Sequence, residues 1–91
     1  MKYDIIFSKQ AKKEIAILRK SDTASFIKLQ KLLYELMEHP YFGTGKPERM
    51  INDYSGYYSR RIGKKYRLVY IIDDDKVIVE ITQVRGHYKD K

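Results

Sequence analysis

Three side chains in the sequence have complementary chemistry: those of Glu48, Arg67 and His87. A carboxylate can accept the proton of an RNA 2′-hydroxyl while that oxygen attacks the adjacent phosphorus. A histidine, which titrates near neutral pH, can then give a proton to the leaving alkoxide. An arginine can stabilise the negative charge that the phosphorus group gains during the attack. Together the three residues predict cleavage of RNA by a base, an acid and an arginine, without a metal ion.

Each of these residues also has a structural explanation, and the sequence leaves both interpretations open. Glu48 is close to two cations with which it can form an ion pair, Lys46 and Arg49. Arg67 can form a salt bridge with a nearby carboxylate, and His87, near the C-terminal end, can simply be solvated. The catalytic interpretation therefore requires a fold that brings the three side chains together.

The charge of the chain indicates a polyanionic partner, with nucleic acid as one candidate. The net charge is +7, and residues 41–70 hold seven basic side chains against two acidic ones, which is +5 of that total. Cysteine is absent, which excludes disulfides, thiolate nucleophiles and cysteine-based metal centres. The acidic residues 73–75 read as a solvated turn, so we expect no metal site and no cofactor.

A membrane partner is not expected. No apolar run approaches the roughly 18 residues of a membrane-spanning helix. The N-terminal stretch, residues 1–7, is too short for a signal peptide, and charged residues interrupt it too early. We therefore predict a cytoplasmic protein.

Hydrophobic periodicity and turn residues predict two helices and four strands. Ser8 is placed to cap the first helix, and His39-Pro40 should end the second, because proline disfavours helical geometry in the residue before it. His39 therefore receives a structural role and no catalytic one. The strands are expected at residues 3–7, 57–62, 66–72 and about 76–84, and the helices at 9–20 and from about 23 to 38.

This order, β-α-α-β-β-β, predicts an α+β fold in which an antiparallel sheet carries two helices on one face. Alternation within the strand at 66–72 places Leu68 and Tyr70 on one face and Arg67 and Val69 on the other. If the helices cover the first face, Arg67 lies on the open face. That open face is then available as a working surface.

Four stretches of the sequence resemble the YoeB branch of the RelE/ParE toxin superfamily, whose members belong to bacterial toxin–antitoxin pairs. They are Gly-Thr-Gly-Lys-Pro-Glu at 43–48, Ser-Gly-Tyr-Tyr-Ser-Arg-Arg-Ile at 55–62, Tyr-Arg-Leu-Val-Tyr at 66–70 and Gly-His-Tyr at 86–88. Their order and spacing match the family, and so does the predicted order of helices and strands. The resemblance implies a single RelE/ParE-like domain over residues 1–88, followed by a short tail at 89–91.

The resemblance also implies a function, that of a ribosome-dependent messenger-RNA endonuclease. Glu48 matches the general base of the family, His87 the general acid and Arg67 the arginine that steadies the scissile phosphate. Tyr88 matches the terminal tyrosine of the site, where an unpaired base can stack on its ring. Arg61 matches a further arginine, for which we expect contact with phosphate or ribosomal RNA.

Two departures from the family pattern concern the cations of the site and the end of the chain. The family often has a lysine three residues after the glutamate, where this sequence has Ile51. Arg49 is a candidate to replace that charge from a different direction, so Arg49 and Lys46 join Arg61 as expected phosphate- or RNA-binding residues. Residues 89–91 extend past the point where the family commonly ends. We expect them to be disordered, with added phosphate contacts as the alternative.

The expected partners are messenger RNA on the ribosome and a small antitoxin of the YefM type, with a homodimer as a further option. Two other functions remain open. One is a non-enzymatic toxin resembling ParE, which acts by binding a topoisomerase. The other is a nucleic-acid- or ribosome-binding module, whose function would survive replacement of Glu48 or His87.

Overall fold

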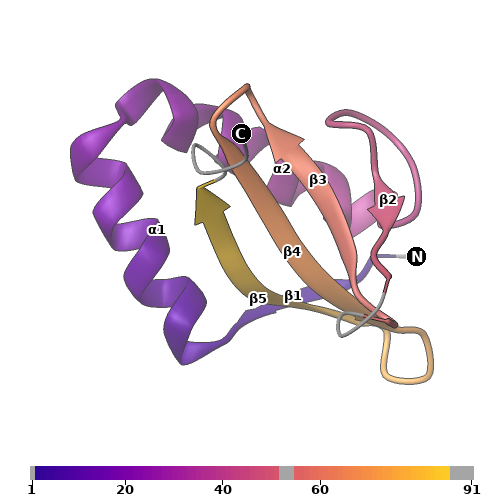
Figure 1. Cartoon of the computed structure of the whole chain (residues 1–91). Helices are drawn as coiled ribbons and strands as arrows, with labels where there is room; N and C mark the ends of the chain where they lie inside the picture. The colour runs from indigo at the N-terminus through magenta and orange to yellow at the C-terminus, as the bar shows by residue number, and fades with distance from the viewer. Residues whose placement is uncertain (1, 52–54, 87–91) are drawn as a thin grey trace.

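The computed structural model describes residues 2–51 and 55–86, and in this part of the chain two helices pack against a five-stranded sheet (Figure 1). The residues predicted as acid and terminal tyrosine, His87 and Tyr88, lie outside the described residues. The elements are β1 (Asp4–Phe7), α1 (Lys9–Ser21), α2 (Thr23–Glu38), β2 (Glu48–Arg49), β3 (Tyr58–Ile62), β4 (Tyr66–Asp73) and β5 (Ile78–Gly86).

The strand order in the sheet is β1-β5-β4-β3-β2. The strands β3, β4 and β5 form the predicted antiparallel meander, but β1 pairs with β5 in parallel. The α+β class is confirmed, while the sheet is mixed where we predicted an antiparallel one. The parallel pair is possible because both helices and three strands separate β1 from β5 in the sequence, so the two strands can run in the same direction. The two-residue strand β2, which we did not predict, pairs with β3.

Side chains cap the starts of both helices, and Ser8 does so as predicted. The Ser8 hydroxyl accepts a hydrogen bond from the backbone N–H of Ala11, and the Asp22 carboxylate accepts one from the N–H of Ser25. His39, directly before Pro40, is the C-terminal cap of α2, as predicted. Neither helix in the described part of the chain is long and apolar enough to cross a membrane.

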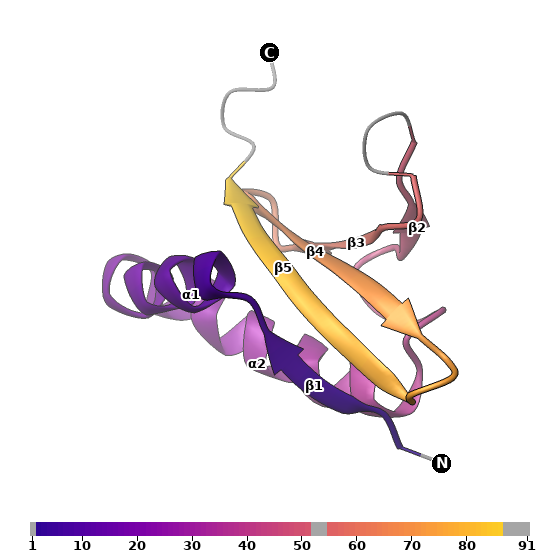
Figure 2. The same ribbon diagram turned by 90° about the horizontal axis from the view of Figure 1, so that it is seen from below.

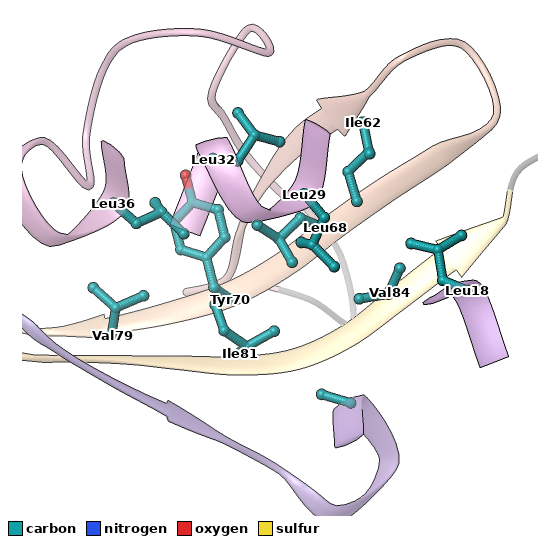
Figure 3. Close-up of a cluster of buried hydrophobic side chains, with 11 residues drawn as sticks. Leu18, Leu29, Leu32, Leu36, Ile62, Leu68, Tyr70, Val79, Ile81 and Val84 are labelled. Carbon is teal, nitrogen blue, oxygen red and sulfur yellow. The ribbon is translucent and has the colours of Figure 1, made fainter. Parts of the chain in front are cut away.

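Both helices lie on one side of the sheet (Figure 2). The core fills the space between the helices and the sheet, as the close-up in Figure 3 shows. Helix α2 contributes three fully or almost fully buried leucines to this core. Leu68 and Tyr70 of β4 are buried on this side, as the strand alternation predicted. The opposite face of the sheet is therefore the one that presents Arg67. The core residues are Ala11, Leu18, Leu29, Leu32, Leu36, Ile62, Leu68, Tyr70, Val79, Ile81 and Val84.

Candidate active site

A shallow pocket of about 540 Å³ lies on the sheet face away from the helices, and it contains both Glu48 and Arg67. Ser59, which is almost completely buried, contributes to the pocket between them. The pocket joins the short edge strand β2 to β4, so two residues that are 19 positions apart in the sequence face the same space. Its lining residues are Glu48, Arg49, Met50, Ile51, Ser59 and Arg67.

The register of the sheet explains why these side chains meet. Glu48 is paired with Ser59, and Arg61 follows two residues later on the same face of β3. Glu48 and Arg61 are therefore diagonal neighbours, whose Cα atoms are typically about 7–8 Å apart. Arg67 is directly opposite Arg61. Of the two arginines, only Arg67 lines the pocket of Glu48, whereas Arg61 lines a separate pocket with residues of α2.

The structural explanations that we considered for Glu48 and Arg67 find no support in the described part of the chain. Glu48 forms no ion pair there with Lys46 or Arg49, and Arg67 forms none with a carboxylate. Glu48 is exposed and Arg67 is half-buried, so both remain accessible to a bound anion or hydroxyl group.

Arg49 and Lys46, the two cations expected to support the phosphate site, lie in different surroundings. Arg49 is the neighbour of Glu48 on β2, and its guanidinium carbon lies 5.9 Å from the centroid of the Tyr58 ring. The Tyr58 ring packs against the core on the helix side, so the Arg49 guanidinium contacts that ring, although Arg49 also lines the pocket of Glu48. Lys46 is exposed in the loop before β2. Ile51, at the position of the family's lysine, is 74% exposed and adds no charge to the pocket.

The loop that carries Glu48 is held by a buried arginine, Arg60, one of the seven basic residues in the segment 41–70. Arg60 is completely buried, and its guanidinium forms an ion pair of 2.6 Å with Glu35 of α2. It therefore adds nothing to the exposed charge, contrary to our interpretation. Its other hydrogen bonds go to the Tyr70 hydroxyl at 3.1 Å and to the carbonyl oxygens of His39, Phe42 at 2.8 Å and Thr44 at 3.3 Å.

Glu35 binds the same loop from the other side. Its carboxylate accepts hydrogen bonds from the backbone N–H of Thr44 at 2.6 Å and from the Thr44 hydroxyl at 2.8 Å. Partial burial raises the pKa of Glu35, but the hydrogen bonds from Thr44 and the contact with Arg60 outweigh it, so the pKa lies below its ordinary value. Glu35 is therefore ionised at neutral pH, as a counterion of buried Arg60 must be.

Gly45 lets this loop approach β3 closely. Its carbonyl oxygen accepts a hydrogen bond of 2.7 Å from the N–H of Arg61, and its φ is +85°, a conformation that favours glycine. A Cβ atom at this position would lie 2.7 Å from the Arg61 carbonyl oxygen. Gly45, the second glycine of the Gly-x-Gly-Lys-Pro-Glu stretch, thus allows the loop to lie close enough to β3 for β2 to pair with it.

A third anchor of the loop involves the acidic turn between β4 and β5. The Asp74 carboxylate accepts hydrogen bonds from the hydroxyl groups of Tyr3 at 2.6 Å and Tyr41 at 2.5 Å. These bonds lower the pKa of Asp74. The turn is exposed, as expected, but Asp74 joins the N-terminal segment to the start of the loop.

The end of β5, which leads to His87, is held by α1. The backbone N–H of Val84 donates to the Glu14 carboxylate at 2.7 Å, and the Gln10 side chain donates to the same carboxylate at 2.9 Å. This contact lies beyond Phe7, where β1 has stopped pairing with β5. The carboxylate thus continues the edge of the sheet where a strand is missing. Nothing in the sequence distinguished Glu14 from the other charged residues of α1.

The chain is similar to known proteins over most of its length. The family described as YoeB-like toxin of bacterial type II toxin–antitoxin system matches residues 7–88. The chain is 32% identical to Toxin YoeB of Escherichia coli strain K12 over 84 residues, which cover 92% of this chain and 98% of that protein. It is 41% identical to Toxin YoeB of Streptomyces coelicolor over 68 residues, which cover 75% and 79% of the two chains.

Solved structures agree with this match. The YoeB dimer from Staphylococcus aureus has a TM-score of 0.82 and 34% identity, covering 97% of this chain and all of that chain. A heterotetrameric YoeB–YefM toxin–antitoxin complex from the same organism has a TM-score of 0.80, with the same identity and coverage.

Proposed function

This chain belongs to the YoeB-like toxin family of bacterial type II toxin–antitoxin systems, and from that premise we propose that it is an endoribonuclease that cleaves messenger RNA on the ribosome. One observation carries the proposal: Glu48 and Arg67 line one pocket on the open face of the sheet. A carboxylate and an arginine in one pocket suit the activation of a hydroxyl group beside a bound phosphate.

In the proposed reaction, Glu48 accepts the proton of the 2′-hydroxyl as its oxygen bonds to the adjacent phosphorus. The bond from phosphorus to the 5′ oxygen then breaks, and His87 gives that oxygen a proton. The products are a 2′,3′-cyclic phosphate and a 5′-hydroxyl group. Arg67 stabilises the charge on the phosphorus group, and the Tyr88 ring supports a base next to the site.

The shape of the pocket agrees with a need for the ribosome. A shallow pocket on an open sheet face offers little surface to orient a flexible single strand, and correct orientation can lower a barrier by about 7–11 kcal/mol. We propose that the ribosome holds the message while the toxin supplies the reacting groups, in the cytoplasm. We assign this activity to a domain of residues 1–88, with residues 89–91 as a tail.

Control by an antitoxin follows from the family and from the charge. The relative from Staphylococcus aureus is found with YefM in a heterotetrameric complex, and it is also found as a dimer. We propose a YefM-like antitoxin for this chain, and a homodimer as one of its states. An acidic segment that folds on binding could pair with Arg61 and Arg67 and so occupy the pocket, which the net charge of +7 favours.

A primer-extension assay tests the function. The wild-type chain should produce new 5′ ends in a message on programmed ribosomes and very few in the same message without ribosomes. His87→Gln should lower the rate of cleavage by about 10²–10⁴-fold, the usual contribution of a general acid. A chain that binds programmed ribosomes but cuts no message, or a His87→Gln variant that cuts at the wild-type rate, contradicts the proposal.

A further inference from the structure

Ser59 of β3 is a buried polar residue whose hydroxyl group has no partner among the described residues. Ser59 is 3% exposed, and two other polar residues are buried to a similar degree, Ser25 and Arg60. The Ser25 hydroxyl donates to the Asp22 carboxylate at 2.8 Å, and Arg60 has its ion pair and hydrogen bonds. The Ser59 hydroxyl forms no such bond within residues 2–51 and 55–86. A buried hydroxyl group without a partner is unfavourable, so its presence requires an explanation.

The sheet directs this hydroxyl group into the pocket of Glu48 and Arg67. Tyr58 and Arg60, the neighbours of Ser59 on β3, contact the core and α2 on the helix side. Because side chains alternate along a strand, Ser59 points to the open face. Ser59 lines the same pocket as Glu48 and Arg67. The unpartnered hydroxyl group therefore lies at the candidate active site.

The register of the sheet places Ser59 between the proposed base and the proposed phosphate-binding arginine. Glu48 is directly opposite Ser59 on β2, and Val69 is opposite it on β4, two residues after Arg67. The Cβ atoms of directly opposite residues are about 4.5–5.5 Å apart, and diagonal neighbours such as Ser59 and Arg67 are about 7–8 Å apart. A phosphate held by Arg67, with its neighbouring 2′-hydroxyl at Glu48, would therefore lie over Ser59.

We propose that Ser59 is a further residue of the catalytic site, whose hydroxyl group donates a hydrogen bond to a non-bridging oxygen of the scissile phosphate. The proposal rests on the proposed function and deepens it, because it adds a neutral donor to the charged groups of the pocket. Serine hydroxyl groups commonly bind phosphate oxygens. The non-bridging oxygens gain negative charge during the attack, so a fixed donor stabilises the transition state more than the bound message. The Ser59 hydroxyl keeps its own proton throughout, while Glu48 takes the proton of the 2′-hydroxyl.

Ser59→Ala removes the hydroxyl group with little change in volume. In single-turnover assays on programmed ribosomes, the variant should cut message about 10²–10³-fold more slowly than the wild type, the usual loss when one donor to a transition-state charge is removed. Its midpoint of urea unfolding should not fall, because the hydroxyl has no partner to lose among the described residues. Cleavage at the wild-type rate overturns the proposal. A lower midpoint also overturns it, because it would show that the hydroxyl is bonded within the folded protein.

The matched control is Ser25→Ala, the same change at a buried serine whose hydroxyl has a partner, Asp22, at the start of α2. This variant should have a lower midpoint of urea unfolding and should cut at the wild-type rate. The two serines are thus expected to show opposite effects on stability and on rate. An equal loss of rate in Ser25→Ala and Ser59→Ala would overturn the special role of Ser59.

A message with sulfur in place of one non-bridging oxygen, at a mapped cleavage position, shows whether the hydroxyl acts on the phosphate itself. Sulfur accepts a hydrogen bond more weakly than oxygen. The wild type should therefore cut one of the two stereoisomers more slowly than the oxygen message, and Ser59→Ala should show a much smaller difference. Equal differences in both proteins overturn the phosphate contact and leave the proposed function standing. A wild-type protein that cuts no ribosome-bound message would instead refute the function itself.

Discussion

Glu48→Gln is expected to lower the rate of message cleavage on the ribosome by about 10²–10⁴-fold, the range that general base catalysis contributes. Glutamine keeps the size of the side chain but cannot accept the proton of the 2′-hydroxyl. Because Glu48 is exposed and forms no ion pair among the residues that the structure describes, the free energy of unfolding should change by less than about 0.5 kcal/mol.

The control for this replacement is Glu38→Gln, which removes a carboxylate from an exposed pair with Lys2 at the end of α2. It should cut at the wild-type rate. Initial rates of primer extension and urea unfolding curves of both variants separate chemistry from stability. A Glu48→Gln protein that is folded, binds ribosomes and cuts at the wild-type rate would remove the general base from the mechanism.

Glu35→Ala is expected to lower the free energy of unfolding by about 3–5 kcal/mol, because it leaves the buried guanidinium of Arg60 without its counterion. The loop carrying Glu48 also loses the two hydrogen bonds from Thr44. Cleavage by the folded fraction should therefore fall as well, although Glu35 does not line the pocket of Glu48.

Glu38→Ala serves as the matched control, since it makes the same change on the same helix. Glu38 pairs with Lys2 at 3.5 Å, and the side chains of Lys2 and Glu38 are 68% and 49% exposed. The side chains of Arg60 and Glu35 are only 0% and 27% exposed. An exposed pair contributes about 0–1 kcal/mol. Similar losses of unfolding free energy in the two variants would contradict the importance of the buried pair.

The buried pair of Arg60 and Glu35 also predicts that the stability of the protein depends on pH. The pKa of Glu35 is lowered in the folded protein, so its contribution to stability is present above the ordinary value of 4.5 and is lost as the pH falls through the lower pKa of the folded state. The difference in unfolding free energy between the wild type and Glu35→Ala should therefore shrink below about pH 4.5.

Most of the fold could be predicted because its signals are local. The cap at Ser8 set the start of α1, the proline after His39 set the end of α2, and alternation in β4 assigned Arg67 to the open face. The parallel pairing of β1 with β5 could not be predicted in this way. It joins residues about 74 positions apart, and no pattern within either strand distinguishes a parallel partner from an antiparallel one.

The supports of the candidate site were harder to predict than its reactive residues. Glu48 and Arg67 stand out by residue type, and sheet register brings them to one pocket. Arg60 looked like another surface cation, although its position directly before Arg61 on a strand already required the two to face opposite sides. Its partner Glu35 is 25 residues away on a helix, so burial of the pair depends on packing that the sequence does not display.

Attack by the 2′-hydroxyl is tested most directly with a message that contains a single 2′-deoxynucleotide on the 5′ side of a mapped cleavage position. On programmed ribosomes, cleavage at that position should disappear, while other positions of the same message are still cut and yield downstream fragments with a 5′-hydroxyl group. Undiminished cleavage at the deoxynucleotide, or downstream fragments with a 5′-phosphate, would show that the 2′-hydroxyl is not the nucleophile and that Glu48 does not act as its base.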